Sequence, residues 1–383
     1  LRCEAGVSLK EILDVFVPKG WFLPVTPGTK FVTVGGAVAS DVHGKNHHVA
    51  GSFCRHVSEI RILLADGSVQ TCSASHNVDL FRSTAGGMGL TGIILDVSFY
   101  MQKIESSMIR QITYRARNID EMFDLIKAHE QSTYTVSWMD CLSKGESRGR
   151  GVLYTGEHAG ADDLAKTKYA KNPLALPGKL PLTVPFTLPS FVLNSLTVKA
   201  FNTALYWSHL SRIKEALVDY DTFFYPLDSI HNWNRIYGRS GFVQYQFVLP
   251  DETAYDGMVT ILNEIASHRL GSFLVVFKRC GNPGQINQVG KKGTPPFFPL
   301  SFPMQGYSLA LDFAIKPGLF EFLNELDDMI QSYGGRVYLT KDARLDAKML
   351  RKMYDGVDEF QRIRKKVDPK HRFQSLLSKR LKL

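Results

Sequence analysis

The chain has 383 residues, which is long for one core and favours two domains. Hydrophobic residues make up 44% and charged residues 22%, as in folded globular proteins rather than disordered ones. Most of the +9 net charge lies between Arg362 and Leu383, where nine Lys or Arg accompany one Asp. Such a tail is typical of a solvated helical face, or of attraction to anionic headgroups or a phosphorylated substrate. It does not favour nucleic acid, which we do not expect as a partner.

No segment predicts membrane insertion, secretion or a disulfide framework. Uninterrupted apolar runs stay well below the roughly 18–20 residues of a membrane helix. The five cysteines are scattered and form no CxxC pair, which argues against disulfides and thiolate zinc. We expect a cytoplasmic or peripheral membrane protein, with a periplasmic location left open. The opening LRCEAGVSLKEIL resembles the middle of a domain, so we expect the native protein to begin further upstream.

The first third of the chain predicts mixed α/β structure. Ser8 and Glu11 form a capping box for a short helix over residues 9–17. Asp66-Gly67 predicts a hairpin turn between two strands. A glycine-dense turn then leads into a strand rich in β-branched and aromatic residues. The expected strands cover residues 21–25, 30–34, 58–65, 68–72 and the stretch after Gly92.

The middle of the chain contains a break in composition. Asn118 opens a helix, and TYTVSWMDCL alternates as a strand does. Prolines then recur every four residues from Pro173 to Pro189, which forbids a continuous helix or a central strand. This stretch is either a surface excursion or a mobile apolar flap over a greasy substrate. The following segment, 191–210, predicts a helix that is too polar to span a bilayer.

The last part predicts an antiparallel α+β sheet backed by helices. Its segments read strand, strand, helix, strand, loop, strand and helix, at 222–227, 241–250, 252–268, 272–280, 281–299, 306–315 and 318–334. A final apolar strand is followed directly by Lys341 and then by two short helices.

Residues 32–53, VTVGGAVASDVHGKNHHVAGSF, carry four glycines and three histidines. His43 and His47 have the spacing of a helical metal pair, but Gly44 and Asn46 are poor helix residues, so we expect no metal site. Glycine turns near Gly28, Gly35 and Gly86–Gly92 offer bare amides to anionic oxygens, and they leave room for a planar cofactor. None has the Rossmann or Walker spacing, but together they predict a cofactor held by loops.

Several motifs resemble those of the decaprenylphosphoryl-β-D-ribose 2′-oxidases, in the vanillyl-alcohol-oxidase/PCMH superfamily of flavoproteins. The motifs are TVGGAVASDVHGKNHHVAGSF, ADGSV, GGMGLTGII, YPLDSIHNWNRIYGRSGFVQYQFVLP, SFLVVFK and YLTKDAR. The similarity extends in one order from about Gly6 to the C-terminus. It is broken mainly in the proline-rich stretch and around residues 281–297.

This resemblance implies FAD as cofactor and an α+β fold. A PCMH-type FAD-binding domain would cover residues 1–106, an inserted substrate domain 107–335, and a return to the first domain 336–383. Family members carry an earlier glycine-rich unit that grips the FAD pyrophosphate. Leu1 already lies past that unit, so only the second half of the FAD-binding domain is expected here.

The resemblance also implies site residues. Catalysis is assigned to Lys341 and His43. FAD contacts are assigned to Gly28, Thr33, Val34, Gly35, Gly36, Ser40, Asp41, Val42, His43, Ile94 and Tyr338. Substrate contacts are assigned to Lys45, Trp138, Tyr225, Gln244, Gln246 and Lys278. The family pattern is broken at Ala310, Ser308 and Val136, which puts the shape of the substrate pocket in doubt.

The residues themselves agree with these roles. Gln244 and Gln246 are two apart on a strand, so both amides face one side and suit sugar hydroxyls, although an exposed sheet face is an alternative. Burial of Lys341 would depress its pKa and let it accept a hydroxyl proton. A cationic Lys341 beside the reduced flavin, or a merely solvated lysine, is the alternative.

We therefore expect an FAD-dependent oxidoreductase. It would oxidise the 2′-hydroxyl of a polyprenylphosphoryl-β-D-ribose to the 2′-keto sugar, the first half of an epimerisation to the arabinose form used in cell-wall glycans. Its partners would be this lipid-linked sugar phosphate and a separate keto-reductase, with peripheral membrane contact. The alternatives are an oxidase of soluble alditols or aldonolactones, and a flavin-less binding module.

Overall fold

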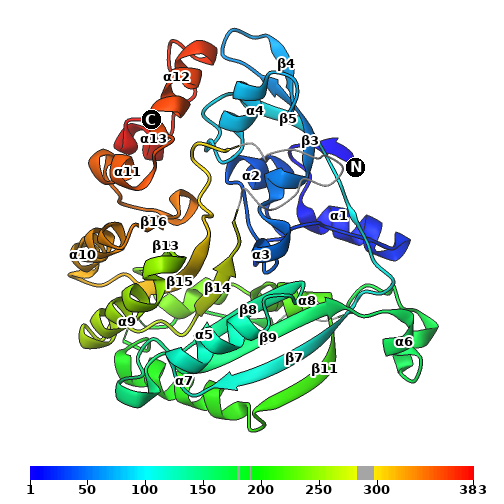
Figure 1. Ribbon diagram of the computed structural model, residues 1–383, viewed down its shortest axis with the longest axis vertical. Coiled ribbons are helices and arrows are strands. Elements are labelled where there is room, and N and C mark those ends of the chain that lie inside the picture. The colour runs from blue at the N-terminus through cyan, green and yellow to red at the C-terminus, as the bar shows by residue number, and fades with distance from the viewer. Residues whose placement is uncertain (179–181, 190, 283–296) are drawn as a thin grey trace. The chain divides into compact units, whose positions relative to one another are not determined.

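A computed structural model describes residues 1–178, 182–189, 191–282 and 297–383. The chain forms two compact units (Figure 1). Unit 1 contains Leu1–Ile104, Gly281–Met304 and Ala343–Leu383, and unit 2 contains Glu105–Cys280 and Gln305–Asp342. Two segments differ from the expected domains. Residues 281–304 belong to unit 1, and residues 336–342, which include Lys341, belong to unit 2.

Unit 1 is built, in the residues that the structure describes, on a four-stranded antiparallel sheet in the order β1-β5-β3-β4. The short strands β2 and β6 pair separately. Its strands are β1 Arg2–Glu4, β2 Trp21–Phe22, β3 Val57–Leu63, β4 Val69–Cys72, β5 Ile93–Phe99 and β6 Gln102–Lys103. Its helices are α1 Leu9–Phe16, α2 Val34–Ala39, α3 His47–Ala50, α4 Val78–Thr84, α11 Ala347–Met353, α12 Val357–Val367 and α13 Leu376–Leu381.

Local signals account for most of unit 1. The capping box of Ser8 and Glu11 opens α1, as predicted. The β3–β4 hairpin also forms, with Gly67 at φ +91° in its turn. The strand expected over residues 30–34 was wrong. Thr33 is instead the N-cap of α2, because its hydroxyl accepts a hydrogen bond from the amide of Gly36 and ends the extended segment there.

Unit 2 is built on an eight-stranded sheet, counted over the described part of the chain, in the order β11-β7-β9-β8-β14-β15-β13-β16. Every neighbouring pair is antiparallel. Its strands are β7 Met108–Ala116, β8 Tyr134–Met139, β9 Gly151–His158, β11 Ile213–Asp219, β13 Phe242–Pro250, β14 Val275–Cys280, β15 Gly306–Ala314 and β16 Arg336–Val337. A separate parallel pair joins β10 Leu182–Thr183 to β12 Ile230–His231. Its helices are α5 Ile119–Ala128, α6 Ala161–Leu164, α7 Ser195–Ser208, α8 Tyr220–Phe224, α9 Asp251–Ser267 and α10 Leu319–Ser332.

The two faces of the large sheet are covered differently. On one face, Phe123 of α5 packs against Phe277 and Tyr307, and Asp327 of α10 accepts a hydrogen bond from Tyr245. On the opposite face, α7 packs Tyr206 against Trp138 and Val152. The rest of that face, over β14, β15 and β13, carries the polar side chains described below. The predicted α+β class, with an antiparallel sheet backed by helices, is confirmed.

One predicted strand of unit 2 was wrong. Residues 222–227, TFFYPL, lie in α8 and the turn after it, because Asp219 caps the amide of Thr222 and starts a helix. A short aromatic run does not by itself distinguish a strand from a helix. Part of the expected loop 281–299 and part of the proline-rich stretch lie outside the described residues. Among the helices that the structure describes, none is both long enough and apolar enough to cross a bilayer.

Candidate active site

Strand register places the polar residues of unit 2 on one face of the sheet. Gln244 pairs with Asp312 across β13 and β15, and Gln246 pairs with Ala310. Lys278 of β14 pairs with Ser308. Side chains of directly paired residues point to the same side of an antiparallel sheet. The predicted common face of the two glutamines is therefore present, and the register brings three more polar side chains to it.

Lys341 reaches this row from a short 3-10 turn, Leu339–Lys341, that follows β16. The amide of Tyr338 donates to the carbonyl of Gln246, and the amide of Lys341 donates to the carbonyl of Tyr338. These two bonds fix the turn beside β13. The Nζ of Lys341 then donates to Oε1 of Gln244 at 2.5 Å.

Burial changes the proton affinity of each charged group in the row. Burial raises the pKa of Asp312 to about 6. The nearby side chains of Gln244, Lys341 and Tyr237 favour the carboxylate and partly oppose this rise. Burial lowers the pKa of Lys341, and the charge of Asp312 opposes that shift. Burial also lowers the pKa of Lys278 to about 8; Cys280 opposes this shift and Lys341 adds to it. The row thus holds two amines whose pKa is lowered by burial, with one carboxyl group beside them whose pKa is raised.

Asp312 and Tyr237 were missed by sequence reasoning. Oδ2 of Asp312 and the hydroxyl of Tyr237 are both buried, and Tyr237 lies close enough to favour the ionised form of Asp312. The available signal was an acidic residue in the middle of the apolar strand YSLALDF. A charged residue at such a position is rarely buried without a partner or a function.

The remaining expected substrate residues of unit 2 are buried more deeply. Gln246 donates from Nε2 to the hydroxyl of Ser308 at 3.1 Å. Trp138 lies in the core beneath α7, and its indole N–H donates to the carbonyl of Phe273. Tyr225 is 1% exposed, with its ring near those of Tyr220 and Phe224. The structure therefore brings Lys341, Gln244, Gln246 and Lys278 to one face, and it gives Trp138 a packing role.

In unit 1 the glycine amides differ from the bare cradle that we predicted. The amide of Gly35 donates to the carbonyl of Ala5, and that of Gly36 donates to the Thr33 hydroxyl. In the Gly86–Gly92 turn, the amides of Gly86 and Met88 donate to carbonyls of α2. These amides hold the unit together, so the expectation of a bare cradle there was wrong.

Gly28 is the glycine that fits the expected cofactor. It is exposed, and a Cβ added to it would meet no heavy atom within 4 Å. Packing within the chain therefore does not require glycine at this position. A planar cofactor lying on the backbone would require it, because a side chain there would stand in its way. Thr33 and Gly36 are exposed as well. This surface is compatible with a bound FAD.

Two other expected cofactor residues have side chains engaged inside unit 1. Asp41 is fully buried at φ +39°, and its carboxylate accepts the amide of Cys54 and, at 2.5 Å, the hydroxyl of Ser301. Its side chain therefore anchors a tight turn. The ring of His43 is buried and lies 5.4 Å from the ring of Phe302, centroid to centroid.

The other expected residues are placed without a decisive contact. Val34 and Val42 are buried, Ser40 and Lys45 are half-buried, and Ile94 pairs with Ile62 across β5 and β3. Tyr338 is buried in unit 2. Across the residues described, no three His, Cys, Asp or Glu side chains gather in a way that would hold a metal ion.

Two known proteins resemble this chain over nearly its whole length, and a third resembles part of it. A decaprenylphosphoryl-beta-D-ribose oxidase of Mycolicibacterium smegmatis is 39% identical over 99% of this chain and 80% of its own length. A protein of Streptomyces coelicolor, described only by its position in the mprA 5′ region, is 32% identical over 98% of this chain and 100% of its own length. A probable L-gulonolactone oxidase 4 of Arabidopsis thaliana is 30% identical over 32% of this chain and 22% of its own length.

Two family models match parts of the chain. The FAD binding domain matches residues 1–73, and the D-arabinono-1,4-lactone oxidase family matches residues 312–381. With the fold and the site, these matches define an FAD-linked oxidase that has a PCMH-type FAD-binding domain. The chain belongs to the decaprenylphosphoryl-β-D-ribose oxidase family. The predicted family, enzyme class and FAD cofactor are confirmed.

Proposed function

We propose that this protein oxidises the 2′-hydroxyl of a polyprenylphosphoryl-β-D-ribose to the 2′-keto sugar. The observation that carries the proposal is the contact of Lys341 with Gln244, beside the buried carboxylate of Asp312. An amine whose pKa is lowered by burial, with an acceptor and an anion next to it, is suited to take a proton from an alcohol. Membership of the decaprenylphosphoryl-β-D-ribose oxidase family supports a lipid-linked ribose as substrate.

In this proposal Lys341 is the general base. Its neutral Nζ accepts the proton of the hydroxyl group, which creates an ammonium ion. Oε1 of Gln244 accepts a hydrogen bond from that ammonium, and the charge of Asp312 stabilises it. Bound FAD would supply the acceptor for the hydride of the carbinol carbon.

The other polar side chains bind and orient the substrate. Gln246 and Ser308 form a hydrogen-bonded pair that can exchange partners with sugar hydroxyls. Lys278 supplies a positive charge for the phosphate. We keep Tyr225 and Trp138 as pocket residues, with Trp138 acting through the packing of the sheet. In unit 1, His43 and Lys45 are assigned to the reacting side of the flavin, and His43 is the second catalytic residue.

FAD itself would lie against the exposed surface formed by Gly28, Thr33 and Gly36. The further contacts that we propose are Val34, Gly35, Ser40, Asp41, Val42, Ile94 and Tyr338. For Gly35 and Asp41 these contacts would come from groups other than the engaged Gly35 amide and Asp41 carboxylate.

The test is anaerobic mixing of the FAD-loaded protein with polyprenylphosphoryl-β-D-ribose, with detection by flavin absorbance. We expect the visible flavin band to bleach, and a 2′-keto sugar to form in equal amount. Absence of bleaching with every polyprenylphosphoryl pentose would refute the substrate assignment.

A soluble alditol or aldonolactone is the second candidate substrate. It is favoured by the match of residues 312–381, which include Asp312 and Lys341, to D-arabinono-1,4-lactone oxidase. The same bleaching assay with a free aldonolactone distinguishes the two, since faster reduction by the lactone would favour this alternative. The FAD binding domain match to residues 1–73 argues against the flavin-less binding module.

We also propose a separate keto-reductase that consumes the product and completes the epimerisation, because a 2′-ketone needs a hydride to become the arabinose form. We further propose peripheral membrane contact, since a polyprenyl substrate resides in a bilayer. A pull-down with the keto-reductase and a vesicle-binding assay test these two proposals.

A further inference from the structure

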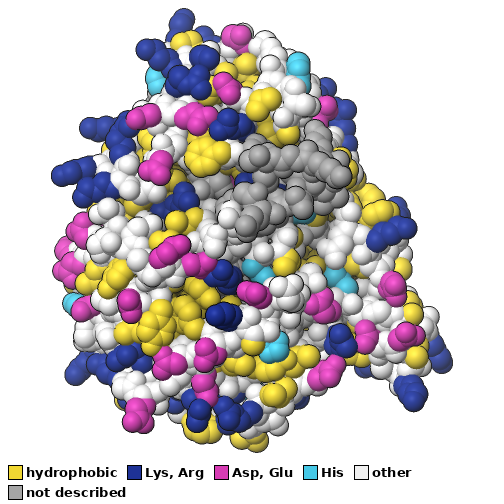
Figure 2. Space-filling view, viewed as in Figure 1, with side chains coloured by type: hydrophobic (Ala, Val, Ile, Leu, Met, Phe, Trp, Pro, Cys, Tyr) yellow, Lys and Arg dark blue, Asp and Glu magenta, His cyan; other side chains and the backbone are white. Residues whose placement is uncertain are grey.

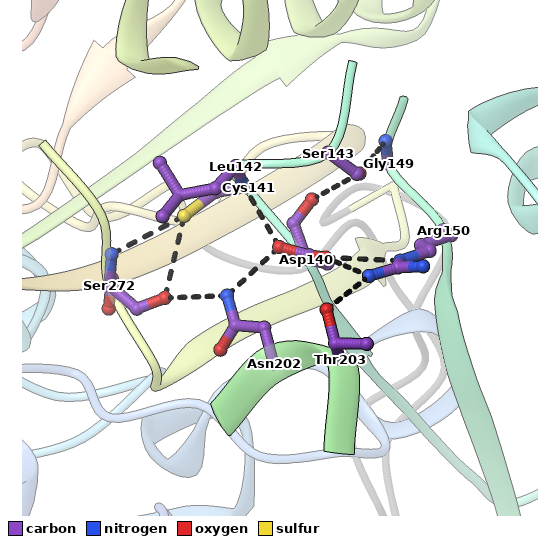
Figure 3. A network of polar contacts seen from close by, with 9 residues as sticks. All are labelled: Asp140, Cys141, Leu142, Ser143, Gly149, Arg150, Asn202, Thr203 and Ser272. Carbon is purple, nitrogen blue, oxygen red and sulfur yellow. Dashed lines mark hydrogen bonds and ion pairs between the residues drawn. The ribbon is translucent and has the colours of Figure 1, made fainter. Parts of the chain in front are cut away.

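Helix α7 of unit 2 is fastened to the sheet by a buried polar network (Figure 3). Asn202 donates to Oδ1 of Asp140 at 2.9 Å, and Arg150 forms an ion pair with the same carboxylate at 3.0 Å. Arg150 also donates to the hydroxyl of Thr203 at 2.9 Å. Val198, Asn202 and Tyr206, spaced four residues apart, form the buried side of the helix. The orientation of α7 is therefore fixed, and so is the side that it turns outward.

The outward side of α7 is apolar. Leu196 and Trp207 are eleven residues apart, which places them on the same side of a helix, with Ala200 between them. Leu196 is 75% exposed and Trp207 is 52% exposed. Leu210, just beyond the helix, is 80% exposed. A single exposed apolar residue is ordinary. Several large apolar residues exposed on the same side of a helix indicate an interaction surface.

Cationic side chains lie beside this side of the helix. On α7 and the segment after it, residues 195–214, the sequence contains Lys199, Arg212 and Lys214 and no Asp or Glu, and Arg212 forms an ion pair with Glu121 of α5. Lys199 is exposed on α7, and the guanidinium of Arg115 lies 4.9 Å from the centre of the Trp207 ring. Lys214 pairs with Thr113 across β11 and β7. At the lower edge of its view, where Figure 1 draws α7, β7 and β11, Figure 2 shows Lys, Arg and apolar side chains with some Asp and Glu among them.

We propose that this surface, Leu196, Lys199, Ala200, Trp207 and Leu210 with Arg115, docks unit 2 onto a bilayer that contains anionic lipids. Leucine and tryptophan enter the headgroup boundary, while lysine and arginine attract the anionic headgroups. The helix is too short to span a bilayer but suits one that lies in its surface. The headgroups of an anionic bilayer supply counter-charges for Lys199 and Arg115. A partner protein without acidic groups at its surface would not.

Sedimentation with vesicles tests this proposal. The full chain, loaded with FAD, is mixed with vesicles of phosphatidylcholine and phosphatidylglycerol, and separately with phosphatidylcholine alone. We expect binding to the mixed vesicles that falls with salt and is weak without phosphatidylglycerol. Leu196→Glu and Lys199→Glu should each lower the bound fraction at least about fivefold, because each adds a charge that the anionic surface repels. Thermal unfolding and FAD content of both variants should match the wild type, since both residues are exposed.

Leu376→Glu is the matched control. Leu376 is 88% exposed and lies on α13 of unit 1, within the basic C-terminal segment. We expect this variant to bind vesicles as the wild type does. Equal loss of binding in Leu376→Glu would assign docking to the C-terminal segment and overturn the proposal.

Two other results would also overturn it. One is a wild-type chain that does not sediment with the mixed vesicles. The other is a wild-type dimer that Leu196→Glu converts to a monomer in light scattering while vesicles bind neither form, which would make the surface a contact between two copies. The assay contains no sugar substrate, so its outcome is separate from that of the proposed oxidation.

Discussion

The Nζ of Lys341 donates a hydrogen bond to Oε1 of Gln244, and Gln244 stands directly opposite Asp312 in the sheet of unit 2. The carboxylate of Asp312 can only accept a hydrogen bond, whereas Lys341 donates one. The side-chain amide of Gln244 therefore suits both neighbours in one orientation, with its oxygen toward Lys341 and its nitrogen toward Asp312. Gln244 therefore positions the lysine, whereas the sequence had suggested that both glutamines bind sugar hydroxyls.

Replacement of Lys341 should separate chemistry from cofactor binding. We expect Lys341→Ala to keep its FAD and to lose turnover by about 10²–10⁴-fold, the usual contribution of general acid–base catalysis. Flavin absorbance measures retention, and anaerobic flavin reduction measures the rate. Lys316→Ala, which removes an exposed lysine of the same unit, should reduce flavin at nearly the wild-type rate. Near-normal reduction in Lys341→Ala would withdraw its catalytic role.

The two glutamines should differ in which kinetic constant they affect. Gln244→Leu removes an acceptor from Lys341, so we expect kcat to fall about tenfold or more with little change in KM. Gln246→Leu removes a group assigned to substrate binding, so its main effect should be a higher KM. Steady-state kinetics of the two variants makes the comparison. A large rise in KM for Gln244→Leu would instead support direct contact with the sugar.

Asp312 should make the protein less stable as pH rises. Its pKa is about 6 in the folded chain, above its ordinary value of 3.8, so between these pH values the folded state binds more protons than the unfolded state. The contribution of Asp312 to the free energy of unfolding therefore falls as pH increases from about 4 to about 6, by at most roughly 1.4 kcal/mol per pH unit. Urea unfolding at several pH values should show this slope in the wild type and lose it in Asp312→Asn. Asp162→Asn, at an exposed position, should behave as the wild type does.

Lys278 should give substrate binding a pH dependence. Its pKa of about 8 means that the side chain is charged below this pH and neutral above it. Attraction to the phosphate of the substrate should therefore weaken, and KM should rise, as pH increases through about 8. Lys278→Arg keeps its charge at these pH values, so its KM should stay flat. A rise of the same size in Lys278→Arg would assign the effect to another group.

Two glycines of unit 1 should fail in different ways. A Cβ at Gly28 meets nothing in the chain, so Gly28→Val should keep the thermal stability of the FAD-free protein but bind FAD less tightly. A Cβ at Gly35 would lie 2.9 Å from the Cβ of Ala5, so Gly35→Val should lower the melting temperature itself. Scanning fluorimetry with and without added FAD distinguishes these outcomes. Unchanged FAD affinity in Gly28→Val would remove Gly28 from the cofactor surface.

The fold was predictable where its signals are local. Ser8 and Glu11 cap α1 within four residues, and Asp66-Gly67 turns the β3–β4 hairpin on its own. The alternation of β13 likewise placed both glutamines on one side. Each of these features depends on residues that are close in the sequence, so the sequence alone is enough to predict it.

The parts that escaped prediction depend on distant partners. The amide of Gly35 is taken up by Ala5, thirty residues earlier, which nothing in the glycine motif reveals. Asp312 belongs to the site because of its register with Gln244, 68 positions before it, and register follows from pairing in the folded sheet. The family resemblance supplied Lys341, but its partner acid had to be found in the structure.

The alternation along β13 also separates the residues that can be substituted without disturbing the core from those that cannot. Tyr245 and Phe247 lie in the core beneath the helices, while Gln244 and Gln246 line the proposed pocket. Substrate preference can therefore be redesigned at the even-numbered positions of this strand with little disturbance of the odd-numbered ones. A single inserted or deleted residue within the strand would exchange the two sets, exposing aromatic rings in the pocket and burying amides in the core. The strand should accept substitutions at its even-numbered positions far better than an insertion or a deletion.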